Sequence, residues 1–93
     1  MVIQNRYDII TRINEHYGKM SKGQKAISAF IYDHYDQAVF MTAAKLGETV
    51  GVSESTVVRY AMFIGYNGYP EFQRDLEDWV QNKINSVQKI GAK

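Results

Sequence analysis

Residues 43–65, AAKLGETVGVSESTVVRYAMFIG, decide the fold of this chain because they encode two helices with very little between them. Thr42 precedes the first apolar repeat, where its hydroxyl can cap a helix, and the spacing predicts that helix over residues 43–50. Ser53 has the same position before the second repeat, which predicts a helix over residues 54–64. The two helices are therefore expected to be almost contiguous.

The connection between these helices has the composition of a helix-turn-helix. Only Gly51, Val52 and Ser53 join them, and a short turn with a glycine between two helices is typical of that motif. Gly51 stands where a positive φ is needed. Gly47 is a small residue in the first helix, where the second must cross close to its backbone. Three apolar residues are expected to close the core between the two helices: Leu46, Val50 and Val57.

The second helix carries polar and basic side chains opposite its apolar face. At about 100° per residue, turning the apolar residues inward turns Ser55 and Arg59 outward, with Thr56 and Val58 beside them. In a helix-turn-helix this helix lies in the major groove with its N-terminal residues at base edges, where hydroxyls and arginine bind bases. We therefore predict three base-reading residues: Ser55, Thr56 and Arg59.

Simpler structural roles compete with these assignments. Ser53 is predicted first as a helix cap and second as a contact to the DNA backbone. Arg59 could instead form a surface ion pair. Glu54 suits the positive end of a helix but would be repelled by phosphates, unless it accepts a hydrogen bond from cytosine. Three lysines are the predicted phosphate contacts: Lys22, Lys25 and Lys45.

The rest of the chain predicts three further helices and no strand, so the expected fold is an all-α, five-helix domain. The first helix is expected over residues 7–17. The second begins behind Ser21, which forms a capping box with Gln24, and continues to about residue 35. His34 is expected to be half-buried, because it continues the apolar stripe of that helix.

The fifth helix is expected to begin at Pro70, since proline suits the first helical position. Its apolar face, from Phe72 through Trp79 to Val87, is longer than one small core needs, so its far end is expected to pack on a second copy. The preceding Asn67-Gly68 pair predicts a plain loop, with a two-residue hairpin as the alternative. Residues 1–87 are the predicted DNA-binding domain, and residues 88–93 a linker or frayed tail.

The composition excludes several functional classes. The chain has 93 residues, which is enough for one core, and no cysteine, which excludes disulfides and thiolate metal sites. It has no apolar run of the roughly 20 residues that span a bilayer. His16 and His34 are too far apart to suggest a metal pair, so no catalytic residue, metal or cofactor is predicted. We expect a cytoplasmic protein that does not bind a membrane.

Net charge does not identify the partner, but the distribution of charge is uneven. Eleven basic and ten acidic side chains give a net charge of +1. Lys19, Lys22 and Lys25 are close together, whereas residues 71–78 contain four acids and one arginine. Such a cluster is ordinarily a solvated face, and phosphate binding is the alternative function.

Two stretches together resemble a known family. SESTVVR at residues 53–59 and IGYNGYPEF at residues 64–72, with SKGQKAISAFI at residues 21–31, resemble the N-terminal domain of RpiR-type (MurR/RpiR family) bacterial transcription regulators. The resemblance extends over about residues 9–76. That family often carries basic residues at the positions of Met62 and Phe63.

The resemblance implies a helical DNA-binding domain, usually followed by a sugar isomerase domain that binds phosphosugars and oligomerises. This chain is therefore expected to be the N-terminal part of a longer regulator, with any phosphosugar effector bound outside these residues. We predict a homodimeric domain that binds double-stranded DNA sequence-specifically in the bacterial cytoplasm and regulates genes of sugar metabolism. The alternative is a helical protein-interaction module that does not bind DNA.

Overall fold

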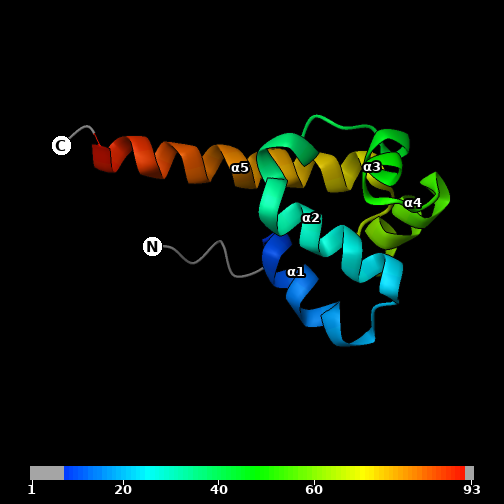
Figure 1. The fold of residues 1–93 in the computed structure, drawn as a ribbon. Coiled ribbons are helices and arrows are strands. Elements are labelled where there is room, and N and C mark those ends of the chain that lie inside the picture. The colour runs from blue at the N-terminus through cyan, green and yellow to red at the C-terminus, as the bar shows by residue number, and fades with distance from the viewer. Residues whose placement is uncertain (1–7, 92–93) are drawn as a thin grey trace.

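The structure, a computed structural model, describes the backbone of residues 8–91 and the side chains of residues 8–83. Within this part every regular element is helical, which confirms the expected all-α fold with five α-helices (Figure 1). The elements are α1 (Ile9–His16), the short 3-10 helix η2 (Tyr17–Lys19), α2 (Lys22–Ala38), α3 (Ala43–Val50), α4 (Glu54–Phe63) and α5 (Tyr69–Gly91).

Side-chain caps determine where the first four α-helices begin. Ser21 forms the expected capping box: its Oγ accepts from the Gln24 N–H at 3.2 Å, and its own N–H donates to Gln24 Oε1 at 2.9 Å. Thr42 and Ser53 cap α3 and α4 as the sequence predicted. Asp8 caps α1, so α1 begins at Ile9. Each cap satisfies a backbone N–H that has no partner within the helix.

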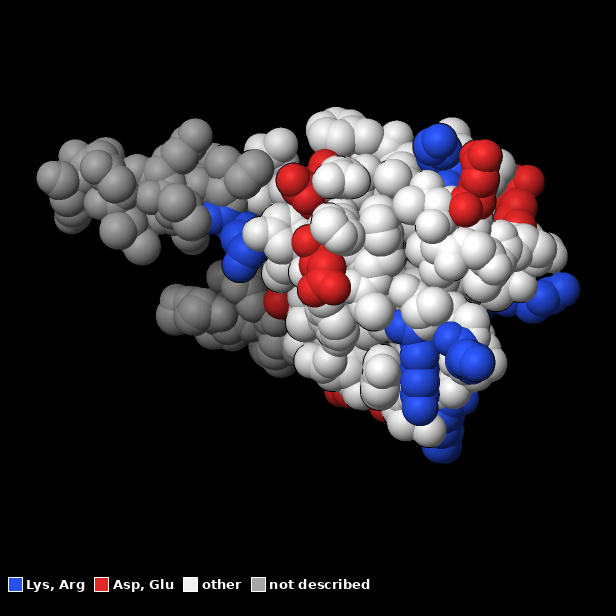
Figure 2. Space-filling model, viewed as in Figure 1, with Lys and Arg blue, Asp and Glu red and all other residues white. Residues whose placement is uncertain are grey.

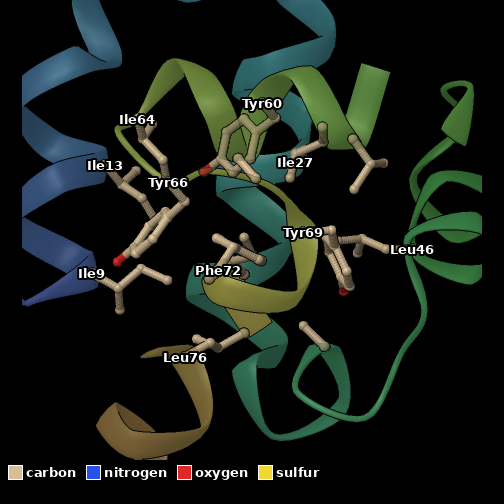
Figure 3. Packing of buried hydrophobic residues seen from close by; sticks show 14 of the residues in the cluster. Ile9, Ile13, Ile27, Leu46, Tyr60, Ile64, Tyr66, Tyr69, Phe72 and Leu76 are labelled. Carbon is tan, nitrogen blue, oxygen red and sulfur yellow. The ribbon is translucent and has the colours of Figure 1, made fainter. Parts of the chain in front are cut away.

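All five α-helices contribute to one core, and α5 crosses it (Figure 3). Phe72 of α5 is fully buried at the centre, where its ring meets the rings of Tyr60, Tyr66 and Tyr69 at centroid distances of 5.4–6.0 Å. Ile13 of α1 and Leu46 of α3 complete opposite sides of this core. The C-terminal end of α5 extends away from α3 and α4, which gives the molecule extents of 44 × 23 × 20 Å (Figure 1).

The junction of α3 and α4 has the expected close backbone approach. A Cβ on Gly47 would lie 2.8 Å from the carbonyl oxygen of Val52 and 3.2 Å from the backbone of Ser53. The Gly47 carbonyl accepts from the N–H groups of both Gly51 and Val52, and Gly51 has φ 96°. Glycine at positions 47 and 51 is therefore required for two different reasons, space at the first and backbone conformation at the second.

The second helix differs from its expected end. It continues to Ala38 rather than stopping near residue 35, and His34 interrupts it with a non-helical φ of −139° and ψ of 43°. This kink changes the direction of the apolar stripe, so His34 is exposed and the prediction that it is half-buried was wrong. Tyr7, where the first helix was expected to begin, lies outside the described residues.

The segment before α5 forms a loop, as expected. No strand occurs between residues 8 and 91, and the Asn67 N–H instead donates to the Glu71 carboxylate at 2.7 Å, so the hairpin alternative was wrong. Pro70 is the second residue of α5 rather than the first, because Tyr69 already has helical structure.

The far end of α5 continues beyond the expected boundary. The helix runs to Gly91, past the predicted end at residue 87, since Gln88, Lys89 and Ile90 are all compatible with a helix. The side chains of Ile84 and Val87 lie outside the described residues. A linker role for residues 88–93 stays a prediction.

We predict that Gly47→Ala destabilises the domain by about 1–3 kcal/mol, because the new methyl group meets backbone atoms that cannot move independently of the turn. The matched control is Gly18→Ala, since nothing lies within 4 Å of a Cβ at that position and its φ is not positive. Urea denaturation should show the control unchanged or slightly more stable. Equal stability of the two variants would contradict the close approach.

Candidate nucleic-acid interface

The outward face of α4 is the candidate interface. Val57, Ala61 and Ile64 are fully buried, as expected, and they anchor α4 to the core. Ser55 and Arg59 are exposed on the opposite side, and Met62 follows them with 55% of its surface exposed. The structure therefore confirms which residues of this helix were predicted to face the core and which to face outward.

Ser55 and Arg59 line one shallow hollow on this face. The hollow has a volume of about 440 Å³, and its lining consists of Glu54, Ser55, Val58 and Arg59. The lining thus combines a hydroxyl, a guanidinium and a carboxylate with the aliphatic side chain of Val58. The face therefore offers both hydrogen-bonding groups and an apolar contact to whatever covers it.

Thr56 is placed differently from the other two predicted base-reading residues. It is half-buried and is not part of the hollow. Its hydroxyl lies 2.8 Å from Ser53 Oγ, which also accepts from the Thr56 N–H at 3.1 Å. Ser53 is thus a cap, as predicted, and Thr56 supports that cap while its methyl group points towards the start of α2.

The start of α2 lies beside the start of α4. A Cβ on Gly23 would be 3.3 Å from Val52 Cγ1 and 3.9 Å from Thr56 Cγ2, so the first turn of α2 touches both the turn and α4. Lys22, the first residue of α2, is exposed at this point. Sequence reasoning missed the role of Gly23, because its partners are about thirty residues away.

The other two predicted phosphate contacts are also exposed. Lys25 lies one turn further along α2, with Nζ 5.2 Å from the centroid of the Tyr17 ring. Lys45 lies on α3, where its Nζ is 3.9 Å from a carboxylate oxygen of Glu48. Both members of that pair are largely exposed, so the interaction is weak and leaves Lys45 available to another anion.

Charge is unevenly distributed over the molecule. Figure 2 shows Lys and Arg side chains gathered over the end where α2 begins, while acidic side chains lie at the upper right over α3 and α4 and again towards the C-terminal half of α2. Asp33 and Asp36 are in the second half of α2, and residues 71–78 of α5 contain four acids. The net charge of +1 therefore conceals a basic region at the start of α2, although the first residue of α4 is the acid Glu54.

A buried hydrogen bond sets the rotation of α4. Tyr60 is fully buried and its hydroxyl lies 2.8 Å from Ser28 Oγ of α2, which is also fully buried. Burial raises the pKa of Tyr60 well above its ordinary value, so the phenol stays neutral and hydrogen-bonded. A rotation of α4 would separate these groups and leave the Tyr60 hydroxyl without this partner in the core, while Ser28 Oγ would still donate to Met20 Sδ at 3.2 Å.

Arg12 of α1 holds the other end of α4. Its Nη1 donates to the carbonyl oxygens of Ile64 and Gly65 at 3.5 and 3.3 Å, and its guanidinium lies 4.6 Å from the centroid of the Tyr66 ring. Gly65 has φ 108°, and a Cβ there would be 2.5 Å from Arg12 Nη1. Sequence reasoning missed this contact, since the two segments are 52 residues apart and share no local signal.

A family model described as the helix-turn-helix domain of the rpiR family matches residues 7–83. The chain belongs to the RpiR family. The match confirms the resemblance found in the sequence, and it covers the hollow, the turn and the basic start of α2. Within the part of this RpiR-family domain that the structure describes, no helix is both long and apolar enough to cross a membrane.

Known relatives of this RpiR-family domain are transcriptional regulators. An uncharacterized HTH-type regulator of Providencia stuartii is 35% identical over 65 residues, which are 69% of this chain and 23% of that protein. The regulator GlvR of Bacillus subtilis is 31% identical over 61 residues (66% and 24%), and HexR of Pseudomonas aeruginosa is 28% identical over 69 residues (74% and 24%). The chain thus spans about a quarter of these relatives. No solved structure matches it significantly.

The different roles of the two serines in this interface can be measured. We predict that Ser53→Ala lowers the free energy of unfolding by about 1 kcal/mol, because the Thr56 N–H loses its cap. Ser55→Ala is the matched control and should stay within about 0.5 kcal/mol of the parent, since the Ser55 side chain is exposed. Thermal denaturation of both variants checks this, and a larger loss at Ser55 would contradict the assignment.

Proposed function

We propose that this domain reads base pairs in the major groove of duplex DNA with the outward face of α4, as part of a bacterial transcriptional regulator. The supporting observation is that Ser55 and Arg59 are exposed together on the walls of one hollow, on the helix that follows the turn. In a helix-turn-helix, side chains at this position reach base edges. Membership of the RpiR family supports DNA as the partner.

Each exposed group has a plausible partner on DNA. Arg59 matches the O6 and N7 acceptors of guanine, and the Ser55 hydroxyl can donate to or accept from several bases. Thr56 stays a proposed contact at the edge of this face, because it is half-buried and does not line the hollow. Lys22 and Lys25 are proposed to bind phosphates, helped by the N-termini of α2 and α4, which carry partial positive charge. Lys45 and Ser53 are the remaining proposed backbone contacts.

We propose further that the domain acts as a homodimer. Phe40, two residues after the end of α2, is 83% exposed, and it borders a pocket of about 120 Å³ beside Val80 of α5. An exposed phenylalanine next to a recess is self-complementary if two copies are related by a two-fold axis. The sequence also continues the apolar spacing of α5 with Ile84 and Val87, on the part of the helix that extends beyond the core.

The biological setting belongs to the same proposal. RpiR-type regulators usually carry a sugar isomerase domain after this one, and the relatives are about four times as long as the matched region. We propose that the regulator acts in the cytoplasm on genes of sugar or sugar-phosphate metabolism. Its phosphosugar effector would bind in the second domain.

The DNA-binding proposal predicts a strongly salt-dependent affinity. Three phosphate contacts per protomer should give a slope of about −2.7 in a plot of log K against log salt concentration for a bound protomer, and about −5.4 for the proposed dimer, because each contact releases counterions. Fluorescence anisotropy with a random duplex between 50 and 200 mM salt measures this slope. A protein-interaction module would show no duplex affinity at low salt, and that result would reject the proposal.

The same assay can assign Arg59. On a duplex selected from a random pool, Arg59→Ala should cost about 1–3 kcal/mol of binding and relax the preference at one base pair. Arg74→Ala is the control, because Arg74 is exposed on α5, away from the hollow. Equal effects of the two substitutions would reject a base-reading role for Arg59.

The dimer proposal predicts concentration-dependent self-association. Sedimentation equilibrium should show dimers of the parent chain, and Phe40→Ser should shift the equilibrium towards monomer by at least about tenfold in Kd, since a buried aromatic ring contributes more than 1.4 kcal/mol. Met62→Ser removes another exposed apolar side chain, on α4, and should leave association unchanged. A parent chain that stays monomeric at high concentration would rule out this dimer.

A further inference from the structure

Val58 is the apolar member of the hollow on α4. It follows Ser55 by one helical turn, precedes Arg59, and lines the same hollow as both. The side chain is half-buried, because part of it packs against the hydrophobic core while the rest faces the hollow. The hollow therefore has an aliphatic side chain on its wall, beside one hydroxyl-bearing and two charged residues.

The position of this aliphatic group is fixed by two constraints. Valine is branched at Cβ, and in a helix one χ1 rotamer is strongly preferred. Packing of its inner side against the core restricts the side chain further. The outward part of Val58 thus presents a preformed apolar contact, and covering it costs little side-chain entropy.

The major groove contains one apolar group that matches such a contact. Among the four bases only thymine carries a methyl group at C5, and aliphatic side chains in the groove pack against it. Hydrogen-bonding groups at the edges of the hollow cannot detect that methyl group. A valine beside the hydroxyl of Ser55 can.

We propose that Val58 determines specificity by packing on the C5-methyl group of a thymine in the half-site. This inference rests on the proposed function, since it requires that the outward face of α4 enters the major groove. Val58 and Arg59 are about 100° apart around the helix, on either side of Ser55, so they meet different base pairs. The half-site should therefore contain a thymine near the guanine that Arg59 contacts.

Met62 is the other apolar residue on this face, and it is a weaker candidate. It lies one turn further along α4, away from the N-terminal residues that approach bases most closely. Its side chain is 55% exposed and unbranched, so it would lose more conformational freedom on contact. The assignment to Val58 rather than Met62 can be tested directly.

The experiment replaces thymine by uracil, which differs only in lacking the C5-methyl group. A preferred duplex is first selected from a random pool, and each thymine of the half-site is then replaced singly by deoxyuridine. One replacement should weaken binding by about fourfold, the factor for burial of one methyl-sized group. In a second pair of duplexes the same position holds cytosine or 5-methylcytosine. The methylated duplex should bind more tightly than the unmethylated one by a similar factor, which would show that the methyl group itself is recognised.

Three variants assign the effect to a side chain. Val58→Ala should reduce the thymine-to-uracil affinity ratio at that position from about four to about one. Val50→Ala truncates another half-buried valine, on α3, and Met62→Ala truncates the neighbouring apolar residue; both should retain the full ratio. Because each variant is compared with itself on two duplexes, a general loss of stability cancels from the ratio.

The possible outcomes separate the two proposals. Absence of any duplex binding rejects the proposed function itself. Binding with no thymine in the selected half-site, or with no sensitivity to any uracil replacement, overturns the inference and leaves the proposed function intact. A uracil effect that persists unchanged in Val58→Ala also overturns it, since another group must then contact the methyl.

Discussion

The close contact of backbones at Gly47 is the constraint on which the rest of the structure depends. The turn after α3 passes so near to α3 that a Cβ at Gly47 would lie 2.8 Å from the Val52 carbonyl oxygen. The same glycine carbonyl accepts two hydrogen bonds from the turn, which closes it tightly. Because of this closure Ser53 caps α4 immediately, and the backbone of the turn restricts the direction of α4 relative to α3. A looser turn would leave that direction free.

The direction of α4 does not by itself determine which of its faces points outward. That rotation depends on the bond between Tyr60 and Ser28, both fully buried, and on Arg12, which binds the carbonyl groups at the end of α4. These contacts come from α2 and α1. Helix α4 is therefore held by α2 at Tyr60 and by α1 just after its C-terminal end. Ser55, Val58 and Arg59 share one hollow as a result. The candidate interface is therefore supported by residues that do not belong to it.

The electrostatics of the domain follow from how its helices are arranged rather than from its composition. A net charge of +1 would suggest no preference for nucleic acid. Packing places the first turn of α2, with Lys22, against the turn and the start of α4. Figure 2 shows basic side chains gathered at this end of α2. Lysines and two helix N-termini thus occur on the same side of the molecule as the outward face of α4. Exposed Phe40 lies at the other end of α2, separate from this side.

The sequence by itself determined the number of helices and the caps at Ser21, Thr42 and Ser53. It also determined that Ser55 and Arg59 face outward. Each of these features depends on residues only a few positions apart. It misjudged His34, where a kink interrupts the periodicity, and it missed Arg12 and Gly23. Only the tertiary structure decided that Arg12 binds the carbonyl groups at the end of α4 and that Gly23 lies against Val52 and Thr56. These contacts join segments about thirty to fifty residues apart, and no local pattern encodes which side chains meet across that distance.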